Sequence, residues 1–89
     1  MSPHMASATP GPSPNPNALR FALDTTLPDT INFTSADEAA GNPFGEAVFQ
    51  VEGVASIFGV NDFVTVNRAP GADWDPIIAA VQAAAAAHL

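Results

Sequence analysis

Apolar and polar residues alternate along the segment from Ala18 to Leu23. Leu19, Phe21 and Leu23 fall on one face of an extended chain, whereas Arg20 falls on the other. A period of two sustained over such a segment is typical of a strand that is buried on one side. The pattern therefore predicts a strand here, with Arg20 on the face opposite the apolar side chains.

A second alternating segment, Thr30–Phe33, follows a turn over residues 24–29 that contains Pro28. It predicts a strand that forms a hairpin with the first one. Ser35 and Glu38 fit a capping box, but no apolar run follows, so they predict a loop or a single turn. A second hairpin is predicted from two apolar segments, Val54–Phe58 and Phe63–Arg68. The connection between them, residues 59–62, contains Gly and Asn, which are typical of hairpin turns.

Two helices are predicted by start signals followed by apolar residues at helical spacing. Asn42-Pro43 places a capping side chain before a proline at the first helical position. Gly45 weakens this helix by about 1 kcal/mol relative to alanine. The second helix begins at Asp73 or Asp75, and the alanine run over residues 83–87 is interpreted as its solvated end. The apolar stripes are Phe44, Ala47, Val48 and Val51 in the first helix and Trp74, Ile77, Ile78, Val81 and Ala85 in the second, with Trp74 assigned to the core.

The element order is therefore β-β-α-β-β-α. We expect an α+β domain of two layers over residues 15–89, in which a mostly antiparallel four-stranded sheet carries two helices on one face. Residues 1–14 hold four of the nine prolines among small residues. Such a segment buries too little apolar surface to offset its ordering entropy, so we interpret it as a flexible leader.

The charge balance limits the classes of partner. Nine acidic side chains stand against two arginines and no lysine, which gives a formal net charge of −7. Affinity for nucleic acid and for anionic membranes comes from clustered basic residues. We therefore expect neither nucleic acid nor a membrane surface as a partner.

The residues that usually carry catalysis or hold metals are scarce. The sequence has no cysteine, and its two histidines, His4 and His88, lie at opposite ends. No thiolate nucleophile, Cys-ligated cluster or Ser-His-Asp constellation can come from this chain alone. We expect a protein that is not an enzyme and binds no metal or cofactor by itself. The N-terminus also lacks the pattern of a secretory signal, so we expect a cytoplasmic monomer.

Two features are candidate binding surfaces. Asn15-Pro16-Asn17 lies beside Arg20, although both asparagines are also explained as turn residues that direct the chain into its first strand. The sheet face opposite the helices is the other candidate. This sheet face is interpreted either as plain solvated surface or as a docking surface on which Arg20 binds a carboxylate or phosphate of a partner. The side chains expected to project from it are Arg20, Asn32, Thr65 and Asn67.

Five blocks follow one another in the order of a known signature: Ser13-Pro14-Asn15-Pro16-Asn17-Ala18-Leu19-Arg20-Phe21, Asn42-Pro43-Phe44, residues 48–58, residues 62–68 and Asp73-Trp74. The first resembles Thr-Pro-Asn-Pro-Asn-Ala-Leu-Lys-Phe, which opens the N-terminal domain of the Nfu/NifU-like family. The others resemble, in turn, its Ser-Pro-Leu helix start, its Leu-Phe-x-Ile-x-Gly-Val-x-x-Val-Phe stretch, its Asp-Phe-Ile-Thr-Val-Thr-Lys strand and the Asp-Trp before its last helix. Arginine replaces lysine at positions 20 and 68, and Gly45 stands where the family favours a helix former.

This resemblance implies a role in iron–sulfur cluster assembly or delivery. In the family, the domain often precedes a second domain whose Cys-x-x-Cys pair carries the cluster. Because this chain has no cysteine, the resemblance implies a stand-alone accessory domain that recruits cluster carriers, a Cys-x-x-Cys scaffold or apo-client proteins. The alternative is a general peptide- or protein-binding module unrelated to iron–sulfur chemistry. The polar residues expected to contact a partner are Asn15, Asn17, Arg20 and Asp62.

Overall fold

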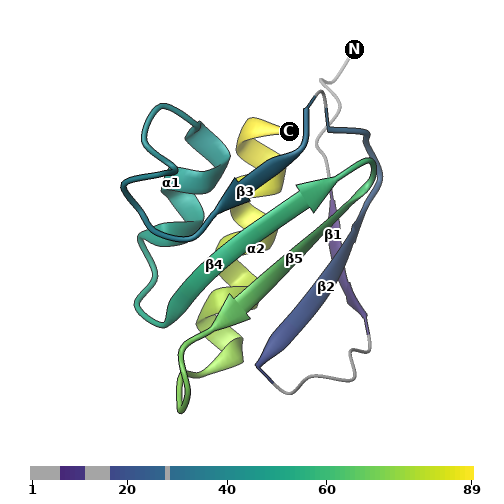
Figure 1. Cartoon of the computed structure of the whole chain (residues 1–89). Coiled ribbons are helices and arrows are strands. Elements are labelled where there is room, and N and C mark those ends of the chain that lie inside the picture. The colour runs from purple at the N-terminus through teal and green to yellow at the C-terminus, as the bar shows by residue number, and fades with distance from the viewer. Residues whose placement is uncertain (1–6, 12–16, 28) are drawn as a thin grey trace.

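A computed structural model describes residues 7–11, 17–27 and 29–89. Within these ranges the chain forms five strands and two helices (Figure 1). The α+β class is confirmed, with one strand more than predicted. In chain order the elements are β1 (Ala8–Gly11), β2 (Ala18–Leu23), β3 (Ile31–Phe33), α1 (Pro43–Phe49), β4 (Val54–Val60), β5 (Phe63–Arg68) and α2 (Trp74–His88).

The strands form one antiparallel sheet in the order β1-β2-β5-β4-β3. The prediction that β2 and β3 form a hairpin is wrong, because β2 pairs with β5 and β3 pairs with β4 at the far edge. The connection between them passes the β4–β5 turn, where the N–H of Leu23 donates to the Asp62 carbonyl (2.7 Å) and that of Leu27 to the Asn61 carbonyl (2.6 Å). Alternation fixes which face a strand buries but does not determine its neighbour.

The additional strand, β1, lies inside the segment interpreted as a flexible leader. It pairs with β2 from Ala8↔Leu23 to Gly11↔Arg20 and forms an edge of the sheet. Pro10 fits there because an edge strand needs backbone hydrogen bonds on one side only. On the helix side, the side-chain amide of Gln82 in α2 donates to the Ala8 carbonyl (3.2 Å). The rest of the predicted leader, apart from Ser7, lies outside the described residues.

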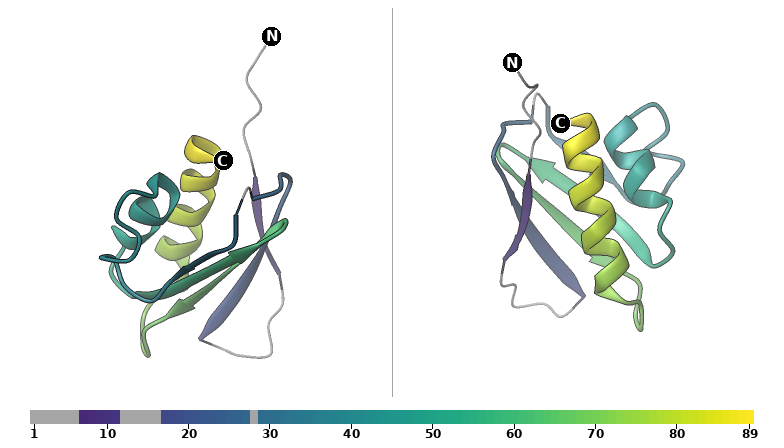
Figure 2. Two further views of the ribbon diagram at one scale, coloured as in Figure 1. Left: turned by 45° about the horizontal axis from the view of Figure 1, so that its top comes forward. Right: turned by 180° about the vertical axis from the view of Figure 1, so that it is seen from behind.

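Both helices pack on the same face of the sheet (Figure 2), as predicted. The alternation in β2 is confirmed: Phe21 and Leu23 are buried, whereas Arg20 is exposed. The core lies between the helices and the sheet. Its largest fully buried side chains are Phe21, Ile57, Ile77, Val48, Val64, Val66 and Val81.

The start of α1 is confirmed. Asn42 is the N-cap, and its side-chain oxygen accepts a hydrogen bond from the Gly45 N–H (2.9 Å). Gly45 has a packing role that the sequence does not reveal. A Cβ at this position would lie 2.8 Å from Cε2 of Phe33, so glycine lets the helix approach β3 closely.

The end of α2 corrects the interpretation of the alanine run. Ala84 and Ala85 are buried at 3% and 0% exposure, because α2 packs against α1 and the sheet along this stretch. Trp74 is half-buried at the edge of the core rather than inside it. The guanidinium of Arg68 lies over its ring, 5.2 Å from the centroid.

The segment after β3 forms turns, as predicted, and Glu38 closes one of them. Its carboxylate accepts hydrogen bonds from the Thr34 N–H (2.6 Å) and the Thr34 hydroxyl (2.8 Å). These bonds, the backbone one first, hold the pKa of Glu38 below its ordinary value, because they favour the ionised carboxylate.

Acidification is therefore expected to destabilise this turn. A carboxyl group whose pKa is lower in the folded state than in the unfolded state stabilises the fold at pH values above its unfolded-state pKa. This stabilisation disappears as the pH falls through the folded-state pKa. We expect Glu38→Gln to lose less stability on acidification than the wild type, as measured by chemical denaturation across the acid range. Thr34→Val keeps the N–H donor and removes the hydroxyl, so it should raise the pKa of Glu38 only part of the way in an NMR titration. An unchanged pH dependence in Glu38→Gln would contradict this account.

Candidate docking face

One face of the sheet is left uncovered by the helices, and we call it the outer face (Figure 2). Side chains of directly paired residues share a face, so the strand register defines its members. They are Thr9, Ala18, Arg20, Ala22, Asn32, Ser56, Phe58, Val60, Phe63, Thr65 and Asn67.

The outer face differs in charge from the rest of the molecule. All nine acidic residues lie in turns, connections and helices, and none lies in a strand. Arg20 is therefore the only charged side chain among the residues that define the outer face. A chain of net charge −7 thus carries a surface that is locally cationic.

Arg20 is supported by an aromatic ring. Its guanidinium lies over the ring of Phe63 on the neighbouring strand, 3.9 Å from the centroid. A planar guanidinium stacked on a ring keeps N–H donors at its edge, where a carboxylate can accept two of them. One row across the sheet joins Arg20, Thr65 and Phe58, because Thr65 pairs with both of the others.

Among the described residues, Phe58 is the large hydrophobic residue that is exposed to solvent, with an exposed fraction of 40%. Val60 and Phe63, which pair with each other beside it, are half-buried. Large apolar side chains gathered on an exposed face are typical of an interaction site. The outer face therefore combines an apolar surface with one oriented cation.

The structure places three of the four residues predicted to contact a partner. Arg20 lies near the centre of the outer face, and Asp62 lies in the β4–β5 turn. Asn17 lies at the opposite end of the sheet, where its side-chain oxygen accepts a hydrogen bond from Nε of Arg68 (3.3 Å) and its carbonyl accepts one from the Arg68 N–H (2.8 Å). Asn15 lies outside the described residues. Asn17 therefore lies apart from Arg20, whereas Asp62 directly precedes Phe63, whose ring contacts the Arg20 guanidinium.

Arg68, the second cation, has a structural role. It points to the helix side of the sheet, where its guanidinium also donates to the Ala72 carbonyl (2.8 Å). It thereby joins the start of β2, the end of β5 and the approach to α2. These contacts leave Arg20 as the arginine directed to the outer face.

Sequence reasoning missed Phe58 and Phe63. The signal was present for Phe63, which is two residues from Thr65 in the same strand, so the two side chains share a face. Phe58 is placed on that face by its pairing with Thr65. Asn67 and Ser56, which also face outward, are joined by a side-chain hydrogen bond (2.9 Å). This bond leaves them fewer free polar groups for a partner than Arg20 has.

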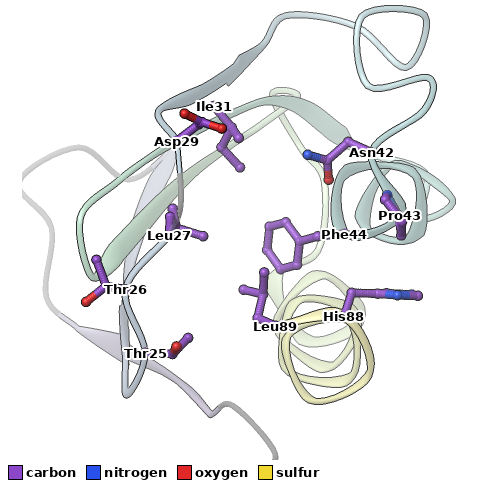
Figure 3. A pocket seen from close by; sticks show the side chains of 10 residues that line it. All are labelled: Thr25, Thr26, Leu27, Asp29, Ile31, Asn42, Pro43, Phe44, His88 and Leu89. Atoms are coloured by element: carbon purple, nitrogen blue, oxygen red, sulfur yellow. The ribbon is translucent and has the colours of Figure 1, made fainter.

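A pocket of about 390 Å³ opens on the other side of the molecule, between the connection after β2, the start of α1 and the end of α2 (Figure 3). Leu27, Ile31, Phe44 and Leu89 point toward its centre. Phe44 and Leu27 are only 2% and 8% exposed, so these two side chains already belong to the core of the domain. We therefore place the candidate site on the outer face.

Within residues 7–11, 17–27 and 29–89, no group of three or more His, Cys, Asp or Glu residues is placed to hold a metal ion. No helix in the same ranges has the length and apolar character needed to cross a membrane.

The fold and the outer face define the chain as a small two-layer α+β domain with one open sheet face. The sequence model of the family described as "Scaffold protein Nfu/NifU N terminal" matches residues 9–89. The chain therefore belongs to the Nfu/NifU N-terminal family. This match includes most of β1. The blocks of the resemblance described above begin only at Ser13, after β1.

Curated relatives extend well beyond the matching region. Conserved virulence factor C of Staphylococcus aureus strain MRSA252 is 34% identical over 74 residues, which cover 82% of this chain and 20% of that protein. A Drosophila ananassae protein, "NFU1 iron-sulfur cluster scaffold homolog, mitochondrial", is 35% identical over 68 residues, which cover 73% of this chain and 24% of that protein. The chain thus spans a fifth to a quarter of the length of these relatives.

Solved structures share the fold. The crystal structure of protein SAV1430 from S. aureus matches with a TM-score of 0.72 at 26% identity, covering 88% of this chain and 96% of that one. The solution structure of SeR13 from Staphylococcus epidermidis matches with a TM-score of 0.58 at 26% identity, covering 83% of this chain and 87% of that one.

Proposed function

We propose that this chain is a non-catalytic interaction domain of iron–sulfur cluster assembly or delivery, which recruits a carrier, scaffold or client protein through its outer face. The observation that carries the proposal is the family match over residues 9–89. The open sheet face with Arg20 stacked on Phe63 supplies the surface through which recruitment would occur. The cluster itself would be held by cysteines of the partner, because this sequence has none.

The proposal is tested by direct binding to a purified Nfu-type domain with a Cys-x-x-Cys pair, in its apo and cluster-loaded forms, under anaerobic conditions. We expect Arg20→Gln to weaken binding about tenfold, as measured by calorimetry, because it removes a charge-assisted hydrogen bond from the interface.

Gln50→Glu is the matched control. Gln50 is exposed at the end of α1, away from the outer face, and the substitution shifts the net charge by one unit in the same direction as Arg20→Gln. It should leave binding unchanged. Equal losses in the two variants would indicate a general charge effect. Failure of every cluster-pathway domain to bind would contradict the link to iron–sulfur chemistry and favour a general binding module.

A further inference from the structure

We infer that the outer face recognises a partner surface that presents one carboxylate beside apolar side chains, with Arg20 holding the carboxylate and Phe58, Val60 and Phe63 burying the apolar groups. This inference rests on the proposed function only in taking the outer face as a docking surface. It names the chemistry of the partner without depending on whether that partner carries a cluster.

Charge complementarity identifies the polar half of the partner. Arg20 is the only charged residue among those that define the outer face, and all nine acidic residues of the chain lie outside the strands. An anionic group is therefore attracted locally, whereas a run of acidic groups would meet the repulsion of a chain with net charge −7. One cation matches one carboxylate.

The stacking of Arg20 specifies the geometry of that carboxylate. The Cζ atom of Arg20 lies 3.9 Å from the centroid of the Phe63 ring, so the ring covers one side of the guanidinium. A carboxylate of the partner would approach from an uncovered side, where it can accept two donors of the guanidinium at once. Lysine would place a point charge there but could not form this paired contact.

The apolar half of the partner follows from the strand register. Thr65 pairs with Arg20 on one side and Phe58 on the other, so the cation and the exposed ring stand two strand spacings apart, about 10 Å. Val60 and Phe63 pair with each other in the next row and extend the apolar surface. A partner that seats a carboxylate on Arg20 therefore brings its neighbouring side chains over Phe58 and Phe63.

The experiment uses short blocked peptides and the whole chain, followed by amide and arginine side-chain NMR shifts. The probes are acetylated, amidated Phe-Glu-Leu, the same peptide with Gln in place of Glu, a peptide of three Glu residues, and inorganic phosphate. We expect Phe-Glu-Leu to bind weakly and to shift the signals of Arg20, Phe58, Phe63 and Thr65. Binding should be about tenfold weaker for the Gln peptide and for the Arg20→Gln variant. Arg20→Lys should retain only part of the affinity.

Several results would overturn the inference. Equal binding of the Glu and Gln peptides would remove the role of the carboxylate. Equal binding of the three-Glu peptide or of phosphate would reduce the site to a general anion site. Shifts that map to the pocket of Figure 3, or self-association of the free chain through the same residues, would place the occupant elsewhere. Unchanged amide dispersion of the variants confirms that they remain folded, so a loss of binding is attributable to the side chain.

None of these results depends on the cluster pathway. Binding of Phe-Glu-Leu without binding of any Cys-x-x-Cys domain would support the partner chemistry and reject the proposed function. The reverse result would keep the proposed function and reject the partner chemistry.

Discussion

Phe21→Ala is expected to lower the free energy of unfolding by about 3–5 kcal/mol. The Phe21 ring is fully buried in β2, which lies between β1 and β5. Its removal takes away a large apolar surface and leaves a cavity that the surrounding strands cannot close. Domains are commonly stabilised by only about 5–15 kcal/mol, so the change is a large part of the total. Chemical denaturation followed by the fluorescence of Trp74, the single tryptophan, measures it.

Arg20→Ala provides the control on the same strand. Arg20 is the adjacent residue but points to the outer face, where it contacts the Phe63 ring. Loss of an exposed cation–π contact costs about 0.5–1 kcal/mol. A destabilisation comparable to that of Phe21→Ala would show that the two faces of β2 are assigned incorrectly.

Gly53→Ala is expected to destabilise the domain for two separate reasons. Gly53 has a φ of 99°, where an L-residue costs about 1–2 kcal/mol. A Cβ at this position would also lie 2.6 Å from the Cβ of Ala72, so the segment before α2 must move. Overpacking of this kind adds about 1–3 kcal/mol. Equilibrium unfolding of the variant gives the combined loss.

Gly71→Ala separates the two contributions. Gly71 has a similar φ of 84°, but a Cβ there meets nothing within 4 Å. It should therefore lose only the backbone part. The double variant Gly53→Ala/Ala72→Gly should recover the packing part of the Gly53→Ala loss. If Gly53→Ala and Gly71→Ala lose the same stability, the close approach of Ala72 does not contribute to the loss in Gly53→Ala.

The parts of the fold that depend on nearby residues could be predicted from the sequence. The alternation in β2, the Asn42 cap of α1 and the β4–β5 hairpin all express interactions within a few positions of the chain. The partner of β3 could not be predicted in the same way. It depends on hydrogen bonds between the connection after β2 and a turn that lies far along the sequence.

Strand β1 was not predicted, because the prolines of residues 1–14 led to their interpretation as a flexible leader. Composition describes how much apolar surface a segment can bury alone, whereas β1 gains its stability from β2 and from Gln82 of α2. The packing role of Gly45 was not predictable for the same reason, because it depends on Phe33, which lies outside the helix. At the candidate site, Arg20 was predictable from its charge and its strand position. The contact of Arg20 with Phe63 was not predictable, because it joins two adjacent strands that are far apart in the sequence.

The pairing of Ala18 with Asn67 has a consequence for the order of folding. The β4–β5 hairpin closes at a turn of two residues, Asn61 and Asp62, and hairpins form in about 1–10 µs. Docking of β2 onto β5 must close a loop that contains most of the domain, so its entropic cost is larger and it comes later. Phe21 and Arg20 arrive on β5 in that same late step. A partner that requires the guanidinium of Arg20 over Phe63 would therefore bind only chains in which β2 has docked on β5, and would not bind chains that have formed the β4–β5 hairpin alone.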